Sequence, residues 1–160
     1  MDYEAARKHF GKRVHDLRKE RNIKQEQLAE RIGKSTEHIS FRFLQLGYVV
    51  LTPYGGNQRY DLVIEDVEGQ FWRVQCKTGW VDEEGTVIRF NTANANITGK
   101  NRQLRHYRGQ CEYFALYNTE LNKVYLIPVD EVGTTRANLR LTTPKNKNQY
   151  GYRMASDYEL

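Results

Sequence analysis

The sequence predicts an α/β protein in which a helical segment at the start of the chain is followed by a sheet. Apolar residues recur at helical spacing up to about residue 46, whereas short apolar, β-branched runs alternate with turn-like segments after that point. The 160 residues are 39% hydrophobic and 28% charged, which provides enough apolar material for one packed domain with a small appendage.

Three helices are predicted in the first 46 residues. The apolar positions of residues 3–33 recur at helical spacing in two stretches, which indicates two helices. A third helix is expected from Ser35, whose hydroxyl suits an N-cap, to Leu46, and Gly47 is suited to end it.

The pattern then changes to strands separated by turn residues. Strands are predicted over residues 48–52, 60–66, 71–77, 86–91, 113–117 and 123–129. Residues 92–103 are polar and rich in asparagine, so we expect a loop there, with a helix or helical turn over about residues 101–108. The stretch 142–153 is expected to be a loop or an edge hairpin.

The composition argues against several classes of protein. No run approaches the roughly 18 apolar residues of a membrane helix, and residues 1–10 lack the apolar core of a secretory signal, so we expect a cytoplasmic protein without a membrane partner. Two separated cysteines and four scattered histidines do not have the spacing of a disulfide framework or a zinc site. The net charge of +5 is a mild bias toward a polyanionic partner.

The polar residues of two neighbouring predicted strands form the most informative pattern. Gln75 and Lys77 are two residues apart, so their side chains share one face of a strand, whereas Cys76 faces the opposite side and is expected in the core. Asp61 begins the preceding strand of the same hairpin. A carboxylate, an amide and an ammonium are therefore expected at one end of the sheet, although an exposed hairpin with ordinary polar residues fits this spacing as well.

These groups suit the hydrolysis of phosphodiesters. Magnesium takes oxygen ligands, usually one or two carboxylates together with water and substrate phosphate. Such an ion polarises the phosphate, and a lysine can orient the attacking water or offset negative charge. The pattern therefore favours a site for Mg²⁺ (or Mn²⁺) with Lys77 beside it.

The same residues carry a resemblance to a known family. Glu37 lies in the third predicted helix, Asp61 begins a strand, and Gln75-Cys76-Lys77 lies on the next strand. This order resembles the PD-(D/E)XK nucleases, and over residues 35–158 it looks most like the small homing endonucleases of group I introns. The resemblance implies a restriction-endonuclease-like core with a mixed central sheet flanked by helices over residues 34–160.

The resemblance also implies the roles of the site residues. The resemblance makes Glu37, Asp61 and Gln75 the expected metal ligands. These three residues and Lys77 form the expected catalytic set. Glutamine replaces the usual acid at position 75, which removes a negative charge, so weaker metal affinity is expected. In most branches of the family this change suggests an inactive enzyme, whereas in the intron-associated branch it is usual. Tyr60 in place of proline is a common variation.

Two polar segments, residues 91–108 and 145–153, have the composition of DNA-contacting loops. Lysine and arginine neutralise phosphates, while Asn, Gln and Arg can form bidentate contacts with base edges. A solvated polar loop is the alternative for each. The basic residues expected to contact DNA are Lys100, Arg102, Arg105, Arg108, Lys145, Lys147 and Arg153.

Residues 10–33 resemble the first two helices of a Cro/C1-type helix-turn-helix. The third helix is followed at once by the strand at Tyr48, so it cannot easily serve both as a recognition helix and as the first helix of the nuclease core. Residues 1–33 are therefore expected to form a truncated or repurposed helical extension. A two-helix piece of this size is too small to be stable alone.

These observations together predict a Mg²⁺-dependent endodeoxyribonuclease of the sequence-specific homing type, acting on double-stranded DNA. One site cuts one strand, so a homo-oligomer (a dimer or a tetramer) is expected. Two alternatives stay open: a nuclease resembling the archaeal Holliday junction resolvases, and a DNA-binding protein that has lost catalysis.

Overall fold

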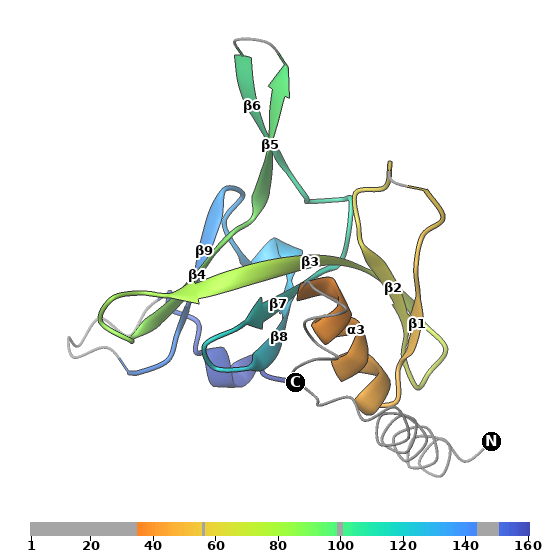
Figure 1. The fold of residues 1–160 in the computed structure, drawn as a ribbon, viewed down its shortest axis with the longest axis horizontal. Coiled ribbons are helices and arrows are strands. Elements are labelled where there is room, and N and C mark those ends of the chain that lie inside the picture. Colours follow the sequence, from red (N-terminus) through yellow and green to blue (C-terminus); the bar gives the residue numbers. More distant parts are fainter. Residues whose placement is uncertain (1–34, 56, 99–100, 144–150) are drawn as a thin grey trace, which may run out of the picture.

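The computed structural model describes residues 35–55, 57–98, 101–143 and 151–160. The helices predicted within residues 3–33 lie outside this part of the chain. Among the described residues, no helix is long and apolar enough to cross a membrane. With the labels of Figure 1, the elements are α3 (Ser35–Gln45), β1 (Val49–Leu51), β2 (Leu62–Glu65), β3 (Phe71–Val81), β4 (Val87–Asn91), β5 (Ala93–Thr98), β6 (Asn101–His106), β7 (Tyr113–Asn118), β8 (Lys123–Pro128), η1 (Val129–Glu131), β9 (Arg136–Arg140) and η2 (Ala155–Asp157).

Strand β3 organises a mixed sheet of seven strands. Its first residues pair with β2 and its last with β4, both antiparallel, while its middle pairs in parallel with β7 along the opposite edge. The sheet runs β1-β2-β3-β4-β9, and β8 continues it beyond β7. The predicted mixed sheet is thus confirmed, and the third helix and five of the predicted strands agree with the structure within two residues at either end.

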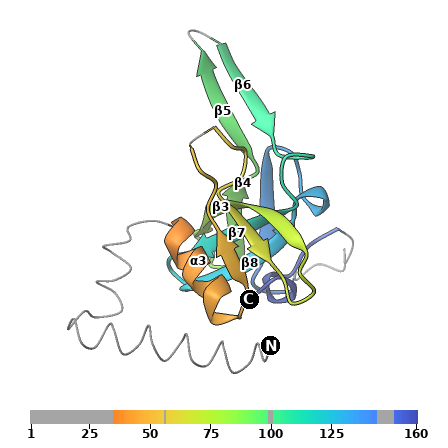
Figure 2. The same cartoon turned by 90° about the vertical axis from the view of Figure 1, so that its right-hand side faces the viewer.

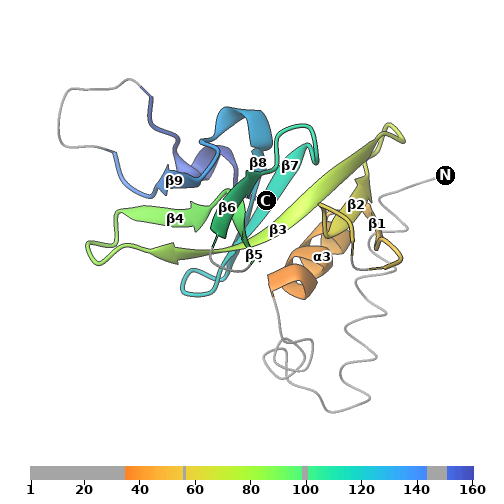
Figure 3. The same ribbon diagram turned by 90° about the horizontal axis from the view of Figure 1, so that it is seen from above.

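Helix α3 packs against one face of this sheet, next to β1, β2 and β3 in the view from above (Figure 3). Ile39 and Phe43 on the helix are fully buried, and they belong to a cluster with Leu62, Val74 and Cys76 of the neighbouring strands. Full burial of a side chain such as Phe43 stabilises the fold by about 2 kcal/mol. Residues 74 and 76 therefore face the helix, which leaves residues 75 and 77 on the other face.

A second apolar cluster lies among β4, β7, β8 and β9. Tyr107, which follows β6, packs edge-on against Phe114, with ring centroids 5.5 Å apart, and Phe90 meets Phe114 in the same way. The other buried members of this cluster are Ile88, Cys111, Leu116, Tyr125, Ile127, Val129, Val132, Ala137, Leu139 and Ala155. The cluster fixes the base of the β5–β6 hairpin to the body of the domain through Tyr107.

The structure corrects the prediction for residues 92–108. They contain no helix in the described part; β5 and β6 form an antiparallel hairpin whose ladder runs from Ala93↔His106 to Thr98↔Asn101. This hairpin projects from the sheet in two perpendicular views (Figures 1 and 2). Each strand gives the other backbone hydrogen-bond partners along their shared edge, so the asparagine-rich segment needs no apolar run to become extended.

Two other differences concern strands. β9 was not predicted, although Ala137 and Leu139 alternate with exposed neighbours there. β3 continues four residues beyond the predicted end, and Gly79 makes this possible: a Cβ there would lie 2.8 Å from Cγ2 of Ile88 and 3.0 Å from Cδ1 of Leu116. Residues 142–153 were predicted as a loop or an edge hairpin, and residues 144–150 of this stretch lie outside the described part.

An ion pair between Arg73 and Glu112 joins β3 to the segment before β7. The Glu112 carboxylate accepts from the Arg73 backbone N–H at 2.7 Å and from both its Nε, at 3.0 Å, and a terminal guanidinium nitrogen. We expect Glu112→Gln to lower the free energy of unfolding by about 1 kcal/mol at neutral pH, because a charge-assisted pair is replaced by weaker hydrogen bonds at a partly exposed site.

The pH dependence of this effect follows from the pKa of Glu112, which the hydrogen bonds from Arg73 hold below its usual value of 4.5. Because the folded pKa is the lower one, the stabilisation is present above 4.5 and is lost as the pH falls through the folded value. Urea denaturation at neutral and acidic pH should show the variant converging on the wild type in acid. A constant difference at both pH values would contradict this role. Glu159→Gln, which weakens the exposed pair with Lys123, is the control.

Candidate active site

Asp61 is the residue immediately before β2, and the backbone orients its carboxylate. Its N–H donates to the carbonyl of Val74 at 2.9 Å, which extends the β2–β3 ladder by one residue. The carboxylate Oδ2 accepts from the N–H of Cys76 at 2.8 Å and from the Gln75 amide nitrogen. Burial raises the pKa of Asp61, and the Cys76 N–H, the Lys77 charge and the Gln75 amide oppose this rise.

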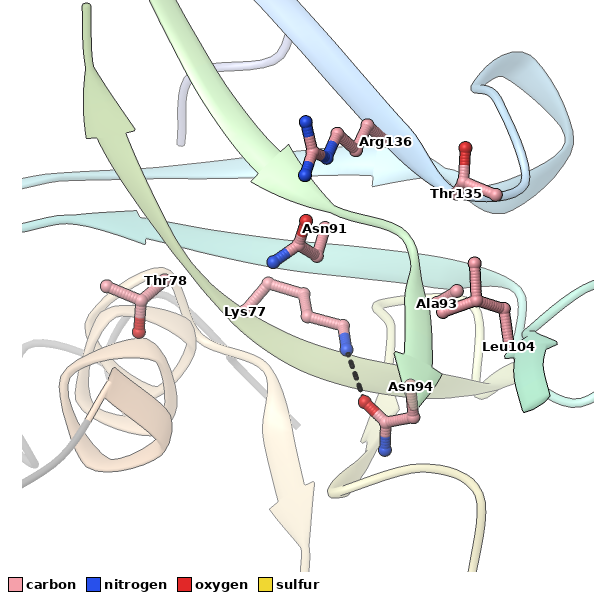
Figure 4. A pocket seen from close by; sticks show the side chains of 8 residues that line it. All are labelled: Lys77, Thr78, Asn91, Ala93, Asn94, Leu104, Thr135 and Arg136. Carbon is pink, nitrogen blue, oxygen red and sulfur yellow. Dashed lines mark hydrogen bonds between the residues drawn. The ribbon is translucent and has the colours of Figure 1, made fainter. Parts of the chain in front are cut away.

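Lys77 lies on the same face of β3 as Gln75, and residues from the hairpin hold its ammonium. Nζ donates to the Tyr107 hydroxyl at 3.2 Å and to Oδ1 of Asn94 at 3.4 Å (the second bond is drawn in Figure 4). It also lies 4.4 Å from the centroid of the Tyr107 ring. Burial lowers the pKa of Lys77, an effect that the charge of Asp61 opposes and that of Arg59 reinforces.

Arg59 ties the loop before Asp61 to the base of the hairpin. Its guanidinium lies 4.3 Å from the Tyr107 ring centroid and donates to the carbonyls of Arg105 at 3.1 Å and His106 at 2.9 Å. Sequence reasoning missed both Arg59 and the function of Tyr107. For Arg59, the available signal was its position two residues before the candidate aspartate. For Tyr107, it was the presence of a lone aromatic residue at the end of a basic stretch.

Glu37 lies in the first turn of α3, and one of its carboxylate oxygens is left without a partner. Oε2 is buried and accepts no hydrogen bond from any described residue. Both Asp61 and Glu37 raise the pKa of the buried Cys76 thiol, after burial itself, so both carboxylates lie within electrostatic reach of that side chain. A buried carboxylate oxygen without a donor is unfavourable unless a cation or water compensates it.

These donors fit a hard divalent cation. Glu37 and Asp61 offer carboxylate oxygens and Gln75 an amide oxygen, which is the ligand chemistry of Mg²⁺ or Mn²⁺. In the described part of the chain, no group of three or more His, Cys, Asp or Glu side chains comes together. A site with glutamine as its third donor contains only two such residues. The amide nitrogen of Gln75 faces Asp61, so service as an oxygen ligand requires this amide to rotate.

The residues predicted to contact DNA are distributed over two regions. Arg102 and Arg105 are on β6 of the projecting hairpin, and Arg105 is exposed. Arg108 follows the hairpin and donates to the Val132 carbonyl at 3.2 Å, so part of its guanidinium is engaged within the domain. Arg153 lies beside β9, where its carbonyl accepts from Arg140. Lys100, Lys145 and Lys147 lie outside the described residues.

Comparison with known proteins agrees with this geometry. A family model described as PD-(D/E)XK endonuclease matches residues 28–160, which include α3 and the whole described sheet. The chain belongs to the PD-(D/E)XK endonuclease family. Its fold is also similar to a solved structure, the bacterial homing endonuclease I-Ssp6803I, with a TM-score of 0.61 and 28% sequence identity over 78% of this chain and 83% of that one. No curated protein matches the chain.

The family membership confirms the fold and the family that the sequence resemblance implied. PD-(D/E)XK nucleases act on DNA and generally use divalent metal ions. In this chain α3 carries Glu37, β3 carries Gln75 and Lys77, and Asp61 lies one residue ahead of β2.

Proposed function

We propose that this protein is a metal-dependent DNA endonuclease of the homing type, which hydrolyses phosphodiester bonds at a specific sequence. The observation that carries the proposal is the convergence of Asp61, Gln75 and Lys77 at one end of the β2–β3 hairpin, together with the unpartnered Oε2 of Glu37 on the adjoining helix. The homing endonuclease with the similar fold supports the choice within the family.

In this proposal Glu37, Asp61 and Gln75 hold Mg²⁺ or Mn²⁺. A cation bound there would polarise the scissile phosphate and stabilise the negative charge that develops on it. Asp61 is oriented for this task by the Cys76 N–H, which fixes one carboxylate oxygen and leaves the other for a ligand. The neutral Gln75 lowers the charge of the site, so we expect a cation affinity below that of a site with three carboxylates.

Lys77 is proposed to contact the scissile phosphate and to offset its charge. The Tyr107 hydroxyl, its ring and the Asn94 amide restrict the ammonium to one position, so less rotamer entropy is lost when the phosphate arrives. Since Asn94 is on β5 and Tyr107 follows β6, the base of the hairpin sets the position of the catalytic ammonium.

The β5–β6 hairpin is proposed as the element that reads the DNA sequence. A two-stranded ribbon fits the major groove, and Asn and Arg side chains suit base edges. The exposed Asn94 and Arg105 are at its base, and Arg102 is further along β6. In this arrangement the same element that enters the groove also contacts Lys77, so binding and cleavage are linked.

A junction resolvase and an inactive DNA-binding protein are the rival functions. Incubation of the full chain with linear duplex and with four-way junction DNA, each with and without Mg²⁺, separates them. Specific cuts in a duplex carrying the target, only with Mg²⁺, support the proposal. Because the target is unidentified, a randomised duplex library serves as the probe. Cleavage of junctions alone would favour the resolvase, and binding without any cleavage would favour the inactive protein.

We further propose that the active form is a homodimer or a homotetramer, since one site cuts one strand of a duplex. Light scattering at micromolar concentration, with and without DNA, is the test. A strict monomer in both states would favour nicking instead of double-strand cleavage. Residues 1–33 are proposed to form a helical extension that packs on the core or on another subunit, because two helices of this size are not stable alone.

The role of Gln75 leads to a prediction about magnesium dependence. Gln75→Ala should reduce cleavage most at limiting Mg²⁺, and extra Mg²⁺ should recover part of the loss, because a missing neutral ligand mainly lowers occupancy. Gln75→Glu should shift the titration to lower Mg²⁺ concentration, since a charged oxygen binds a hard cation more strongly. The measurement is a Mg²⁺ titration of the cleavage rate for the three proteins.

The rate of Gln75→Glu at saturating Mg²⁺ is a separate readout. A second charge at this position can bind the ion too tightly or displace the attacking water, so a lower maximal rate together with tighter Mg²⁺ binding is expected. Three superimposable titrations would place Gln75 outside the site. The conservative control is Gln70→Ala, in the exposed turn before β3.

A further inference from the structure

A cavity of about 420 Å³ lies next to Lys77 (Figure 4). Strands β3, β4, β5 and β9 contribute to its wall, and every polar group that lines it can donate a hydrogen bond. None of its lining residues is acidic. The lining residues are Lys77, Thr78, Asn91, Ala93, Asn94, Leu104, Thr135 and Arg136.

Arg136 is the second cation of this cavity, and its guanidinium is uncommitted. It begins β9, where it is paired in register with Asn91 of β4, so the two side chains lie next to each other on one face. Among the described residues, no hydrogen bond or ion pair engages the Arg136 side chain, which is exposed. By contrast, Arg89, which is on the same strand as Asn91, has a guanidinium nitrogen 3.7 Å from Oδ2 of Asp82. Arg73 is likewise paired with Glu112.

The chemistry of this lining matches a phosphodiester. A planar guanidinium with free donors binds phosphate oxygens in a bidentate manner, and neighbouring amide and hydroxyl groups can complete the contacts. The cavity is large enough for a phosphate with part of its sugar, and Lys77 forms its wall toward the candidate active site. An acidic side chain would compete for Arg136, but the lining contains none.

We propose that this cavity binds the DNA phosphate adjacent to the scissile one, and that Arg136, with Asn91 beside it, is the residue that holds it. The proposal rests on the proposed function, in which Lys77 contacts the scissile phosphate. Arg136 is a positioning residue: it fixes the strand one nucleotide away from the reacting bond, so that the scissile phosphate lies in reach of Lys77. Because β2 pairs with β3 before Lys77 and β4, which carries β9 beyond it, pairs with β3 after Lys77, the strand is then held on both sides of Lys77.

The test uses thymidine 3′,5′-bisphosphate as the probe, with the full-length protein and without Mg²⁺. In an NMR titration of backbone amides, we expect the probe to shift the resonances of residues that line the cavity. Arg136→Ala should weaken binding roughly 10- to 100-fold, since a bidentate charged contact is lost. Arg136→Lys should recover only part of the affinity, because a lysine lacks the planar fork. Arg89→Ala, an arginine already paired and outside the cavity, should bind as the wild type does.

Cleavage assays on the same variants separate this proposal from the proposed function. With a DNA substrate, Arg136→Ala should raise KM and lower kcat/KM, and the salt dependence of DNA binding should fall by about one phosphate contact, whereas Arg89→Ala should leave both closer to the wild-type values. If the protein cleaves no DNA but the probe binds through Arg136, the cavity stands as a phosphodiester site and only the endonuclease proposal fails. Equal affinity of wild type and Arg136→Ala for the probe, or shifts confined to residues elsewhere, would overturn the inference.

Discussion

Lys77→Ala is expected to reduce the rate of DNA cleavage by a factor of about 10² to 10⁴ while DNA affinity stays close to that of the wild type. The charge of Lys77 lowers the pKa of Asp61, and the charge of Asp61 in turn raises the pKa of Lys77. The charge matters most where negative charge develops on the scissile phosphate. For binding, in contrast, it is one cation among many along the DNA. The measurement is single-turnover cleavage at saturating Mg²⁺, together with DNA binding in Ca²⁺.

The variant should fold, which makes the result interpretable. Burial lowers the pKa of Lys77, which means that the folded protein disfavours the charged form, so removal of the ammonium is expected to cost little stability. The Tyr107 ring keeps its edge-on contact with Phe114. Lys123→Ala removes an exposed lysine that pairs with Glu159 and serves as the control for loss of charge. Undiminished cleavage by Lys77→Ala would refute the proposed role of this residue.

Strand alternation explains how much of the candidate site could be predicted. Gln75 and Lys77 share one face because Val74 and Cys76 are buried against α3, and the expectation of a core position for Cys76 is confirmed, with 8% of its surface exposed. The hydrogen bond from Cys76 to Asp61 likewise follows from pairing of adjacent strands. These features depend on residues at most 16 positions apart, where local periodicity is informative.

Groups that come from distant segments could not be predicted in the same way. Tyr107 reaches Lys77 across 30 positions, and its role depends on the hairpin that precedes it. Arg102, Arg105 and Arg108 are three residues apart, a spacing that suits a helix face, and the asparagines of β5 give no strand signal alone. Only the pairing of the two segments decides between helix and hairpin.

Arg136 was not predicted as a functional residue, because the alternation of buried and exposed residues in its strand covers only five positions.

Asp61→Asn is the second substitution with a large expected effect. The asparagine oxygen can still accept the Cys76 N–H, and the Gln75 amide can rotate to pair with the new amide group, so the local hydrogen bonds can be kept. The lost element is one negative charge next to the proposed cation. We therefore expect cleavage to fall by a factor of about 10² or more and the binding of Mn²⁺, followed by calorimetry, to weaken strongly.

Stability gives this prediction a readout that is independent of activity. Burial raises the pKa of Asp61 in the folded protein above its unfolded value of 3.8, so the folded state disfavours the charged carboxylate. As the pH rises above 3.8, ionisation of this group therefore lowers the free energy of unfolding. Asp61→Asn should therefore be at least as stable as the wild type at neutral pH and lose this advantage in acid. Asp61→Ala, which leaves the Cys76 N–H without its acceptor, should be less stable than Asp61→Asn. An active Asp61→Asn would show that the charge is not needed. An inactive variant that also unfolds more easily than the wild type would instead mean that the carboxylate holds the β2–β3 hairpin together. The charge of Asp61 would then not lower stability in exchange for cation binding, as we expect here.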